Sequence, residues 1–390
     1  MPIPQPLTPH PPSPSVEAQA LSARLAALIA EDLRARDNWI NFARFMELAL
    51  YAPGIGYYSA GSRKFGAAGD FVTGPELSPL FGRCIARQLA ELIGQGIPSI
   101  VEVGAGSGAL AADILRELAA LGKLPERYLI LEVSADLRER QRATLAERAA
   151  PWCDRVQWLE VLPAPLPAVV IGNEVLDAIP TQIVRMHGGE LQEIGVAIDD
   201  AGAFVWAERP ARGELLAAAR ELALPDGYQT EVNLAARAFV QSFARLIDRG
   251  ALLFIDYGFP ARELYHPQRA QGTLMCHYRH RAHGDPLVMV GLQDVTAHVD
   301  FTAVAHAGVA AGMEVLGYTN QAHFLINCGI TDLLSEVSPD DAHAYAPLAA
   351  QAQQLLSPTE MGELFKVIAL GKGVAGPLRG FARGDKSHTL

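Results

Sequence analysis

Short apolar runs alternate with amphipathic segments along most of the chain, and this alternation sets the expected fold. The segments 109–121 and 135–148 carry apolar residues three or four positions apart, as helices packed on a sheet do. The runs expected to form strands are 100–103, 128–132, 156–159, 168–172, 251–255, 313–318 and 365–370. Strands that alternate with helices predict an α/β fold with a Rossmann-like, doubly wound and mostly parallel sheet.

The alternation is interrupted after the fourth and the fifth expected strand. The first insertion, at about 178–230, contains alternating segments with Gly188 and Gly189 between two of them, which predicts a hairpin. A helix is expected over 229–247, and the second insertion, at about 257–302, is long and polar. Both insertions follow the carboxyl ends of strands, where ligands bind in open α/β sheets.

The two ends of the chain differ from this core. Residues 1–14 include seven prolines and predict a disordered tail, whereas helical periodicity in 15–97 predicts an N-terminal helical cap. Ser78, followed by a proline, is expected to cap a helix there. The cofactor-binding core is expected at 98–375, followed by a flexible tail at 376–390.

Composition and charge narrow the classes of function. Half of the 390 residues are hydrophobic, enough for a large core, and the formal net charge is −11. A general nucleic-acid binder would need a basic face, whereas an acidic chain can attract a basic protein. The four cysteines lie far apart, which predicts neither a zinc site nor disulfides and fits a reducing compartment. The proline-rich start and the lack of a long apolar run favour a bacterial cytoplasmic protein without membrane insertion.

The segment 99–108 reads S-I-V-E-V-G-A-G-S-G and has the form of a strand, a tight turn and a helix start. Gly104, Gly106 and Gly108 allow positive φ angles and let a ligand approach the main chain. The first N–H groups of the following helix would point at that ligand. Glu132 ends the next expected strand, where a carboxylate can accept hydrogen bonds from both hydroxyls of a ribose. The pattern predicts a nucleoside-containing cofactor.

Glu102 helps to choose between the possible cofactors. Gly104, Gly106 and Ala109 also satisfy the dinucleotide pattern G-x-G-x-x-G/A, so NAD or FAD stays open at this point. An acid two residues before the first glycine would oppose a pyrophosphate but suits the ammonium group of a methionine. The E-x-G-x-G-x-G form therefore favours S-adenosylmethionine, with Glu102, Ala105 and the glycines at the cofactor. A loop that has lost its ligand is the other alternative.

Two acidic residues follow the fourth expected strand, which closes with Asn173. In this fold that strand end faces the reactive methyl group, so Asn173 is expected beside the cofactor. Glu174 and Asp177 are three residues apart and share a face on a turn, where two carboxylates can receive a guanidinium group. Their role would be orientation and electrostatic stabilisation, because simple deprotonation of arginine is too costly. The alternative is a helix N-terminus stabilised by acids.

A third carboxylate, Asp256, closes the fifth expected strand and is a further catalytic candidate. In the insertion that follows, His280 with Asp285, or His298 with Asp300, could form a general base. The chain lacks the G-x-S-x-G motif of a nucleophile elbow, which argues against a hydrolase.

The histidines of the second insertion also allow a metal to be considered. His277, His280 and His283 recur at three-residue spacing, as metal ligands can. Arg279 and Arg281 lie between them and would repel a cation. We therefore expect no metal, and a hydrogen-bonded wall on the acceptor side of the site instead.

Several motifs occur in the order found in a known family. They are 69–78 (G-D-F-V-T-G-P-E-L-S), 101–108 (V-E-V-G-A-G-S-G), 172–180, 256–258 (D-Y-G), 272–286 and 294–301 (D-V-T-A-H-V-D-F). On these motifs the chain, from about residue 39 to 372, resembles the MidA-like methyltransferases, whose mitochondrial members assist assembly of respiratory complex I. The first and the last two of these motifs are far more specific than the glycine loop.

The resemblance implies a class I methyltransferase fold and S-adenosylmethionine as the cofactor. For the mitochondrial members it also implies symmetric dimethylation of an arginine on a core subunit of complex I. It places Thr73, Pro75 and Glu76 in a loop beside the cofactor, together with the glycines and Glu132 already named. Where relatives often carry two aromatic residues after the strand-end acid, this chain has Val175 and Leu176.

We therefore expect a cytoplasmic, S-adenosylmethionine-dependent methyltransferase that acts on arginine in a protein, a subunit of a respiratory complex I type, with no nucleic-acid partner. A small-molecule methyltransferase on the same fold is one alternative. An assembly chaperone that binds the cofactor without catalysis is another.

Overall fold

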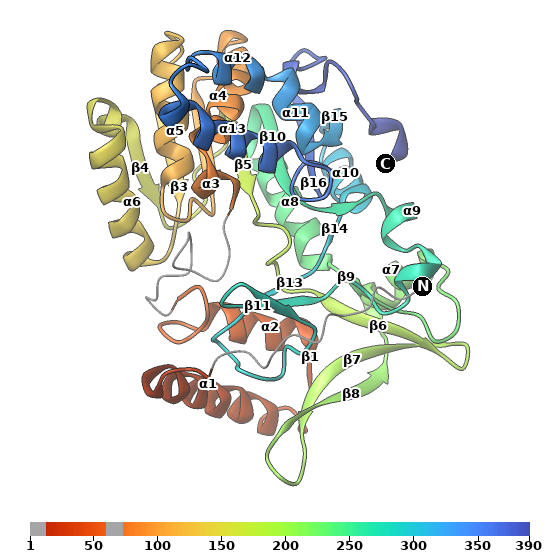
Figure 1. Cartoon of the computed structure of the whole chain (residues 1–390). Helices are drawn as coiled ribbons and strands as arrows, with labels where there is room; N and C mark the ends of the chain where they lie inside the picture. The colour runs from red at the N-terminus through yellow and green to blue at the C-terminus, as the bar shows by residue number, and fades with distance from the viewer. Residues whose placement is uncertain (1–12, 60–72) are drawn as a thin grey trace. The chain divides into compact units, whose positions relative to one another are not determined.

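The computed structural model describes residues 13–59 and 73–390. Most of the proline-rich segment 1–14 lies outside the described residues, as does the 69–72 part of the first family motif. The chain divides into two compact units (Figure 1). The core unit contains 73–177, 237–264 and 299–390, and the insertion unit contains the described residues 13–59, 178–236 and 265–298.

The core unit is built on an eight-stranded sheet. Its main order is β15 (Glu314–Asn320), β16 (Phe365–Lys372), β10 (Ile247–Phe259), β5 (Leu166–Asn173), β2 (Ser99–Val103), β3 (Arg127–Leu131) and β4 (Val156–Leu159), with β14 (Val299–Asp300) beside β10. The strands from β10 to β4 are parallel, whereas β16 runs antiparallel to β10 and to β15. The predicted α/β class with a mostly parallel sheet is confirmed, and each of the seven expected strands is present.

Helices bury their apolar faces against this sheet. Three of these helices lie side by side in the order α4 (Pro79–Gly94), α5 (Ala109–Ala120) and α6 (Ala135–Arg148) (Figure 1). Ser78 caps α4 as predicted, because its Oγ accepts the N–H of Leu80 at 3.3 Å. The other helices of this unit are α3 (Gly74–Leu77), α8 (Leu234–Leu246, which crosses the unit boundary), α9 (Ala261–Leu264), α10 (Phe301–Ala310), α11 (Gln321–Asn327), α12 (Ile330–Ser335) and α13 (Ala342–Leu356).

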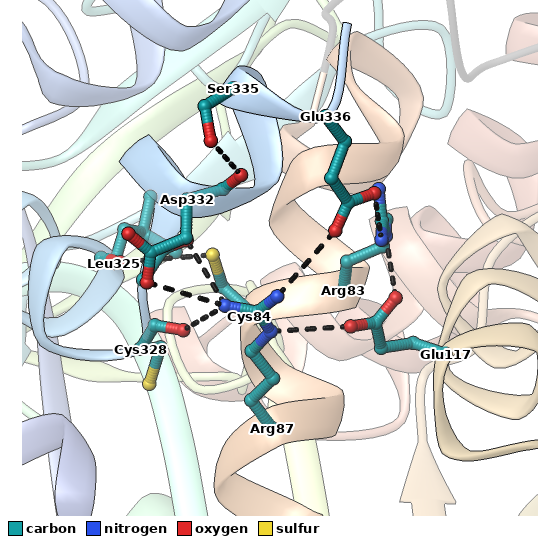
Figure 2. A network of polar contacts seen from close by, with 10 residues as sticks. Arg83, Cys84, Arg87, Glu117, Leu325, Cys328, Asp332, Ser335 and Glu336 are labelled. Atoms are coloured by element: carbon teal, nitrogen blue, oxygen red, sulfur yellow. Dashed lines mark hydrogen bonds and ion pairs between the residues drawn. The ribbon is translucent and has the colours of Figure 1, made fainter. Parts of the chain in front are cut away.

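Figure 2 shows a network of ion pairs that ties α4 to α5 and to the end of α12. Glu117 of α5 accepts hydrogen bonds from Arg83 Nε at 2.6 Å and from Arg87 Nε at 3.2 Å. Both arginines of α4 also pair with Glu336, which follows α12, at 2.8 and 3.7 Å. The side chain of Glu117 is 4% exposed and that of Glu336 is 49% exposed, so the pairs with Glu117 are the less screened by water.

The C-terminal segment 376–390 is folded, so the flexible tail that we expected is wrong. Leu378 and Phe381 are buried in the apolar core of the unit. The backbone N–H of Tyr318 on β15 donates to Asp385 Oδ1 at 2.9 Å, and its carbonyl accepts the N–H of Lys386 at 2.6 Å. The segment therefore covers main-chain groups of an outer strand of the sheet, which stabilises that edge.

The insertion unit combines three helices with two small sheets. The helices are α1 (Val16–Arg34), α2 (Phe42–Tyr51) and α7 (Gly213–Glu221), and α7 lies in the chain before the last strand of the first sheet. That sheet has the order β1 (Ile40–Asn41), β7 (Glu190–Ile198), β6 (Gln182–His187), β9 (Gln229–Val232), with β8 (Phe204–Pro210) beside β7. The second sheet has the order β12 (Arg281–His283), β11 (Met275–Tyr278), β13 (Asp294–Thr296). The predicted hairpin is confirmed, with Gly188 and Gly189 at positive φ in its turn.

Two boundaries differ from the expected ones. The helix expected over 229–247 is a strand and then a helix, because Gln229–Val232 pairs with β6 and Asn233 Oδ1 then caps α8 through the N–H of Ala236 at 2.8 Å. The segment 15–97 is not one helical cap: α1 and α2 share an apolar cluster with strands of the insertions, whereas α4 belongs to the core unit. Among the described helices, none has the length and apolar character needed to cross a membrane.

Candidate active site and cofactor site

The glycine loop joins β2 to α5 in the predicted strand–turn–helix form. Gly104, Gly106 and Gly108 have φ angles of 68°, 52° and 85°, which explains why glycine suits these positions. A Cβ on Gly104 would lie 2.5 Å from Val175 Cγ1, so the loop packs tightly there. A Cβ on Gly106 would meet no described atom within 4 Å. The main chain at Gly106 therefore borders space that no described atom fills.

The segment that carries Thr73, Pro75 and Glu76 lies against this loop. Thr73 is the N-cap of the short helix α3, and Pro75 stands in its first turn. The hydroxyl of Ser107, between the second and third glycines, hydrogen-bonds Glu76 Oε1. The resemblance places these residues beside the cofactor. The Ser107–Glu76 hydrogen bond holds Glu76 against the glycine loop, and contact of the three residues with the cofactor stays a prediction.

Glu132 lies directly after β3 and is 8% exposed. Its Oε1 accepts the N–H of Ser134 at 2.8 Å, and its Oε2 accepts Gln141 Nε2 at 3.2 Å. Burial raises the pKa of this carboxyl, and the hydrogen bonds from Ser134 and Gln141 oppose that rise. Gln141 also donates to the carbonyl of Gly106 at 3.1 Å. It thus joins the glycine loop to Glu132, a role that the polar helix sequence around it gave no reason to expect.

Glu102 is buried on β2 and accepts a hydrogen bond from the hydroxyl of Tyr128 at 2.7 Å. Burial raises the pKa of Glu102 to about 7, although the Tyr128 hydrogen bond favours the carboxylate. A group with this pKa changes charge near neutral pH. An ammonium group close to it would favour the carboxylate further.

The end of β5 carries the acidic loop that was predicted to face the acceptor. Glu174 has a φ angle of 54°, a left-handed conformation that a residue other than glycine rarely adopts. Asn173 Nδ2 donates to Glu174 Oε1 at 2.9 Å. Asn173 Oδ1 is buried and has no partner within the described part of the chain. A buried acceptor of this kind is expected to meet a donor from a ligand or from water.

Asp256 at the end of β10 holds the acidic loop. Its Oδ2 accepts the N–H groups of Val175, Leu176 and Asp177 at 3.0, 2.8 and 3.3 Å, and its Oδ1 accepts the N–H of Tyr257 at 2.8 Å. The side chain is fully buried, which raises its pKa to about 7 against the effect of these hydrogen bonds. We predicted a catalytic residue here, but the carboxylate is committed to backbone groups. The geometry gives Asp256 the role of positioning the loop.

Tyr257 is a site residue that the sequence reasoning did not single out. Burial, and next the negative charges of Glu174, Asp177 and Asp256, raise the pKa of Tyr257, so its hydroxyl stays protonated at neutral pH. Its ring packs on Phe365 of β16, with centroids 3.8 Å apart. The D-Y-G motif at the strand end was the available signal. The structure therefore brings Glu174, Asp177 and Tyr257 together in the core unit.

His280 and Asp285 belong to the insertion unit. His280 is exposed at the two-residue turn between β11 and β12, with a φ angle of 60°. Asp285 Oδ1 accepts the N–H of Leu287 at 3.0 Å. Among the described residues no hydrogen bond joins His280 to Asp285, so the geometry does not support this pair as a His–Asp base. Their contact with an acceptor stays a prediction.

The other candidates of the second insertion have structural partners. Asp300 Oδ1 caps α10 through the N–H of Ala303 at 3.0 Å. The backbone N–H of His298 donates to Thr273 Oγ1 at 3.0 Å. Within the described ranges, no group of three or more His, Cys, Asp or Glu side chains is arranged to hold a metal ion.

Glu231 is a buried carboxylate that the sequence reasoning missed. It accepts the N–H of Thr273 at 2.9 Å, the hydroxyl of Thr273 at 3.0 Å and the N–H of Leu274 at 3.3 Å. A Cβ on Gly272 would lie 2.3 Å from Glu231 Oε1, which explains the glycine. The G-T-L segment of the family motif is thus fixed by an acid about forty residues earlier in the chain.

The parallel sheet, the glycine loop, the carboxylate after β3 and the acidic loop after β5 together define a class I, S-adenosylmethionine-dependent methyltransferase. Residues 81–319 match the model of a family described as "putative S-adenosyl-L-methionine-dependent methyltransferase". The chain belongs to this family, which confirms the resemblance predicted from its motifs.

Solved and curated relatives agree with this assignment. A crystal structure of a superfamily protein from Burkholderia thailandensis, bound to S-adenosyl-homocysteine, has 53% identity and a TM-score of 0.95 over 97% of this chain and 100% of that one. The mitochondrial protein arginine methyltransferase NDUFAF7 of Danio rerio is 30% identical over 85% of this chain and 83% of that protein. The protein of the same name from Mus musculus is 31% identical over 85% and 80%. The cofactor of this chain is S-adenosylmethionine.

Proposed function

We propose that this protein transfers the methyl group of S-adenosylmethionine to a guanidinium nitrogen of an arginine in a protein, a subunit of the respiratory complex I type. The observation that carries the proposal is the acidic loop of Glu174 and Asp177 at the end of β5. Val103 of β2 pairs with Gly172 of β5, so this loop and the glycine loop leave the sheet side by side. Val175 contacts the position of Gly104 directly.

The residues around the glycine loop fit the cofactor. Glu132 would accept hydrogen bonds from the ribose hydroxyls, and Glu102 would pair with the ammonium group of the methionine part. The buried Asn173 Oδ1 would accept a hydrogen bond from the same ligand. The other residues that would contact the cofactor are Thr73, Pro75, Glu76, Gly104, Ala105, Gly106 and Gly108. When bound, the cofactor supplies an electrophilic methyl group on its sulfonium sulfur.

The acidic loop supplies what an arginine substrate requires. A guanidinium offers several N–H donors in a fixed plane, and the carboxylates of Glu174 and Asp177 can accept them while balancing its positive charge. The attacked nitrogen must lose one proton as it gains the methyl group from the sulfonium sulfur, and Glu174 would accept that proton. Tyr257, which stays protonated, can donate a hydrogen bond within the same cluster. The names of the two vertebrate relatives support arginine as the acceptor.

The test is methyl transfer to proteins of an extract that lacks this enzyme. Purified protein is added with S-adenosylmethionine that carries a labelled methyl group, and the modified residues are mapped by mass spectrometry. Wild-type protein should label arginine in a complex I-type subunit, and Glu174→Gln should not. Labelling of a small molecule only would contradict the proposal, as would cofactor binding without transfer to any protein.

A further inference from the structure

We propose that Gln141 is a positioning residue for the ribose of the cofactor and that Trp158 fixes the orientation in which it acts. Gln141 lies on α6 and is fully buried. Its amide makes three hydrogen bonds, two as a donor and one as an acceptor. This inference rests on the proposed role of Glu132 as the residue that binds the ribose hydroxyls.

The three partners of Gln141 come from three different parts of the core unit. Nε2 donates to the carbonyl of Gly106 at 3.1 Å and to Glu132 Oε2 at 3.2 Å. Oε1 accepts the indole N–H of Trp158 on β4 at 2.8 Å. One side chain thus links the glycine loop, the carboxylate after β3 and the next strand of the sheet.

Trp158 determines which end of the amide faces the cofactor site. An indole nitrogen can only donate, so the atom that it meets on Gln141 must be the oxygen. Both amide hydrogens are then directed at Gly106 and Glu132. A flipped amide would set its oxygen against the Gly106 carbonyl and the Glu132 carboxylate and its NH₂ group against the indole N–H, so three attractive contacts would become repulsive.

The close approach of α6 to the loop makes this arrangement possible. A Cβ on Gly108 would lie 3.1 Å from the Cα of Gln141, so a larger residue at Gly108 would push the helix away. Trp158 is held in turn by Arg142, whose guanidinium carbon lies 4.8 Å from the centre of the indole ring. Contacts outside the cofactor site therefore support the position of the amide.

These contacts orient the carboxylate of Glu132 before the ligand binds. Ser134 fixes Glu132 Oε1 and Gln141 fixes Oε2, so the carboxylate cannot rotate freely. Its remaining lone pairs are then available to two ribose hydroxyls. Because the Glu132 carboxylate is already oriented, less conformational entropy is lost when the ligand binds, and the affinity for the ligand is higher. The effect should be confined to ligands that carry those hydroxyls.

The experiment measures the affinity of the full-length protein by calorimetry for two ligands: S-adenosylhomocysteine and its 2′,3′-dideoxyribose analogue. The variants are Gln141→Leu, which removes the amide, and Trp158→Phe, which removes only the indole N–H among polar groups. Gln157→Leu is the matched control, because Gln157 is an exposed glutamine one position before Trp158.

We expect Gln141→Leu to weaken S-adenosylhomocysteine about tenfold and Trp158→Phe about threefold to fivefold, the scale of one lost hydrogen bond. The dideoxy analogue should change less than about twofold in both variants, and Gln157→Leu should leave both ligands unchanged. Equal losses for the two ligands would show a merely structural role and overturn the proposal, as would unchanged affinity in Trp158→Phe. If Gln141→Leu does not fold, Trp158→Phe carries the test.

A double variant separates this inference from the role of Glu132. In a Glu132→Ala background, Gln141→Leu should cause no further loss of affinity, because the two residues act as one unit. Full additivity would overturn the proposal. A Glu132→Ala variant that binds S-adenosylhomocysteine as tightly as wild type would instead remove the proposed role of Glu132 and this inference with it, while methyl transfer to arginine could still be observed.

Discussion

Asp256 Oδ2 and the backbone N–H of Leu176 lie 2.8 Å apart, and this hydrogen bond links the end of β10 to the acidic loop that follows β5. The same oxygen accepts the N–H groups of the residues on either side of Leu176. Glu174, just before them, has a φ angle of 54°, which costs energy unless neighbouring contacts hold it. A buried carboxylate therefore sets the conformation of the loop that should meet the substrate.

Asp256→Asn should lower methyl transfer more than cofactor binding. The amide keeps one acceptor oxygen but sets an NH₂ group against backbone donors, which should destabilise the fold by about 1–3 kcal/mol. We expect kcat to fall at least about tenfold while the affinity for S-adenosylhomocysteine stays within about threefold, because the substitution removes hydrogen bonds to the acidic loop and leaves those of Glu132 and Gln141 intact. Calorimetry would measure the affinity, and single-turnover experiments would measure the rate of methyl transfer. A wild-type kcat would contradict the positioning role.

Glu174→Gln should preserve the fold and cofactor affinity but lower methyl transfer by about 10²–10⁴-fold, the range for losing a positioned acid–base or electrostatic group. Asp177→Asn should have the same direction and a smaller effect if it only orients the guanidinium. Single-turnover transfer at saturating cofactor is the measurement. Glu160→Gln, at an acid that is 67% exposed, is the control and should transfer normally. Wild-type rates in Glu174→Gln would show that the acids only shape the loop.

Gly106→Val should abolish cofactor binding, and Gly122→Val should not. Both glycines have positive φ angles, of 52° and 65°, and a Cβ on either would meet no described atom within 4 Å. The two substitutions therefore carry a similar backbone strain in the unliganded protein. Only the side chain at Gly106 would occupy the space proposed for the ligand. Calorimetry with S-adenosylhomocysteine distinguishes them, and equal binding losses would mean that strain alone explains the effect.

Binding of S-adenosylhomocysteine should strengthen as the pH rises through about 7. Burial raises the pKa of Glu102 to about 7, and only its carboxylate form pairs with an ammonium group. The carboxylate fraction rises from about one tenth at pH 6 to about nine tenths at pH 8, so affinity should increase by up to about tenfold. Glu102→Gln should lack this part of the dependence. A wild-type curve with the same slope as the variant would remove Glu102 from the cofactor site.

The same pKa determines the sign of a stability effect in the unliganded protein. The pKa of Glu102 lies above its ordinary value of 4.5, so the folded state retains a proton that the unfolded state releases. The stability that this group contributes is present below about pH 4.5 and is lost as the pH rises to about 7. Denaturant unfolding of wild type and Glu102→Gln across this window should show a steeper fall in the wild type.

The fold and the cofactor loop could be predicted because their signals are local. Apolar runs of strand length gave the parallel sheet, and Gly104, Gly106 and Gly108 marked a turn that needs positive φ angles. Glu76 was found only through the family resemblance, since its contact with Ser107 joins residues thirty-one positions apart.

The features of the site that could not be predicted depend on which hydrogen-bond partner a polar side chain has in the folded protein. A carboxylate at a strand end can face a ligand or the N–H groups of a neighbouring loop, and Asp256 takes the second option. Gln141 is one polar residue on a polar helix, and its importance comes from contacts with Gly106, Glu132 and Trp158 that have no sequence pattern. The folded C-terminal segment had a signal that we did not use, in the apolar pair Leu378 and Phe381.

The last prediction concerns stability away from the site. Glu117→Gln should destabilise the protein by about 3 kcal/mol, because it removes a nearly buried charge that pairs with Arg83 and Arg87 and leaves two arginines without their main partner. Denaturant unfolding would measure the change.

Affinity for S-adenosylhomocysteine should stay within about twofold, since the network shown in Figure 2 ties α4, α5 and α12 and includes no proposed site residue. Glu160→Gln is again the control: Glu160 is 67% exposed, so its ion pair with Arg138 is screened by water and should contribute less than about 1 kcal/mol. Equal effects of the two substitutions would show that the network of Glu117 adds no more stability than a surface ion pair does.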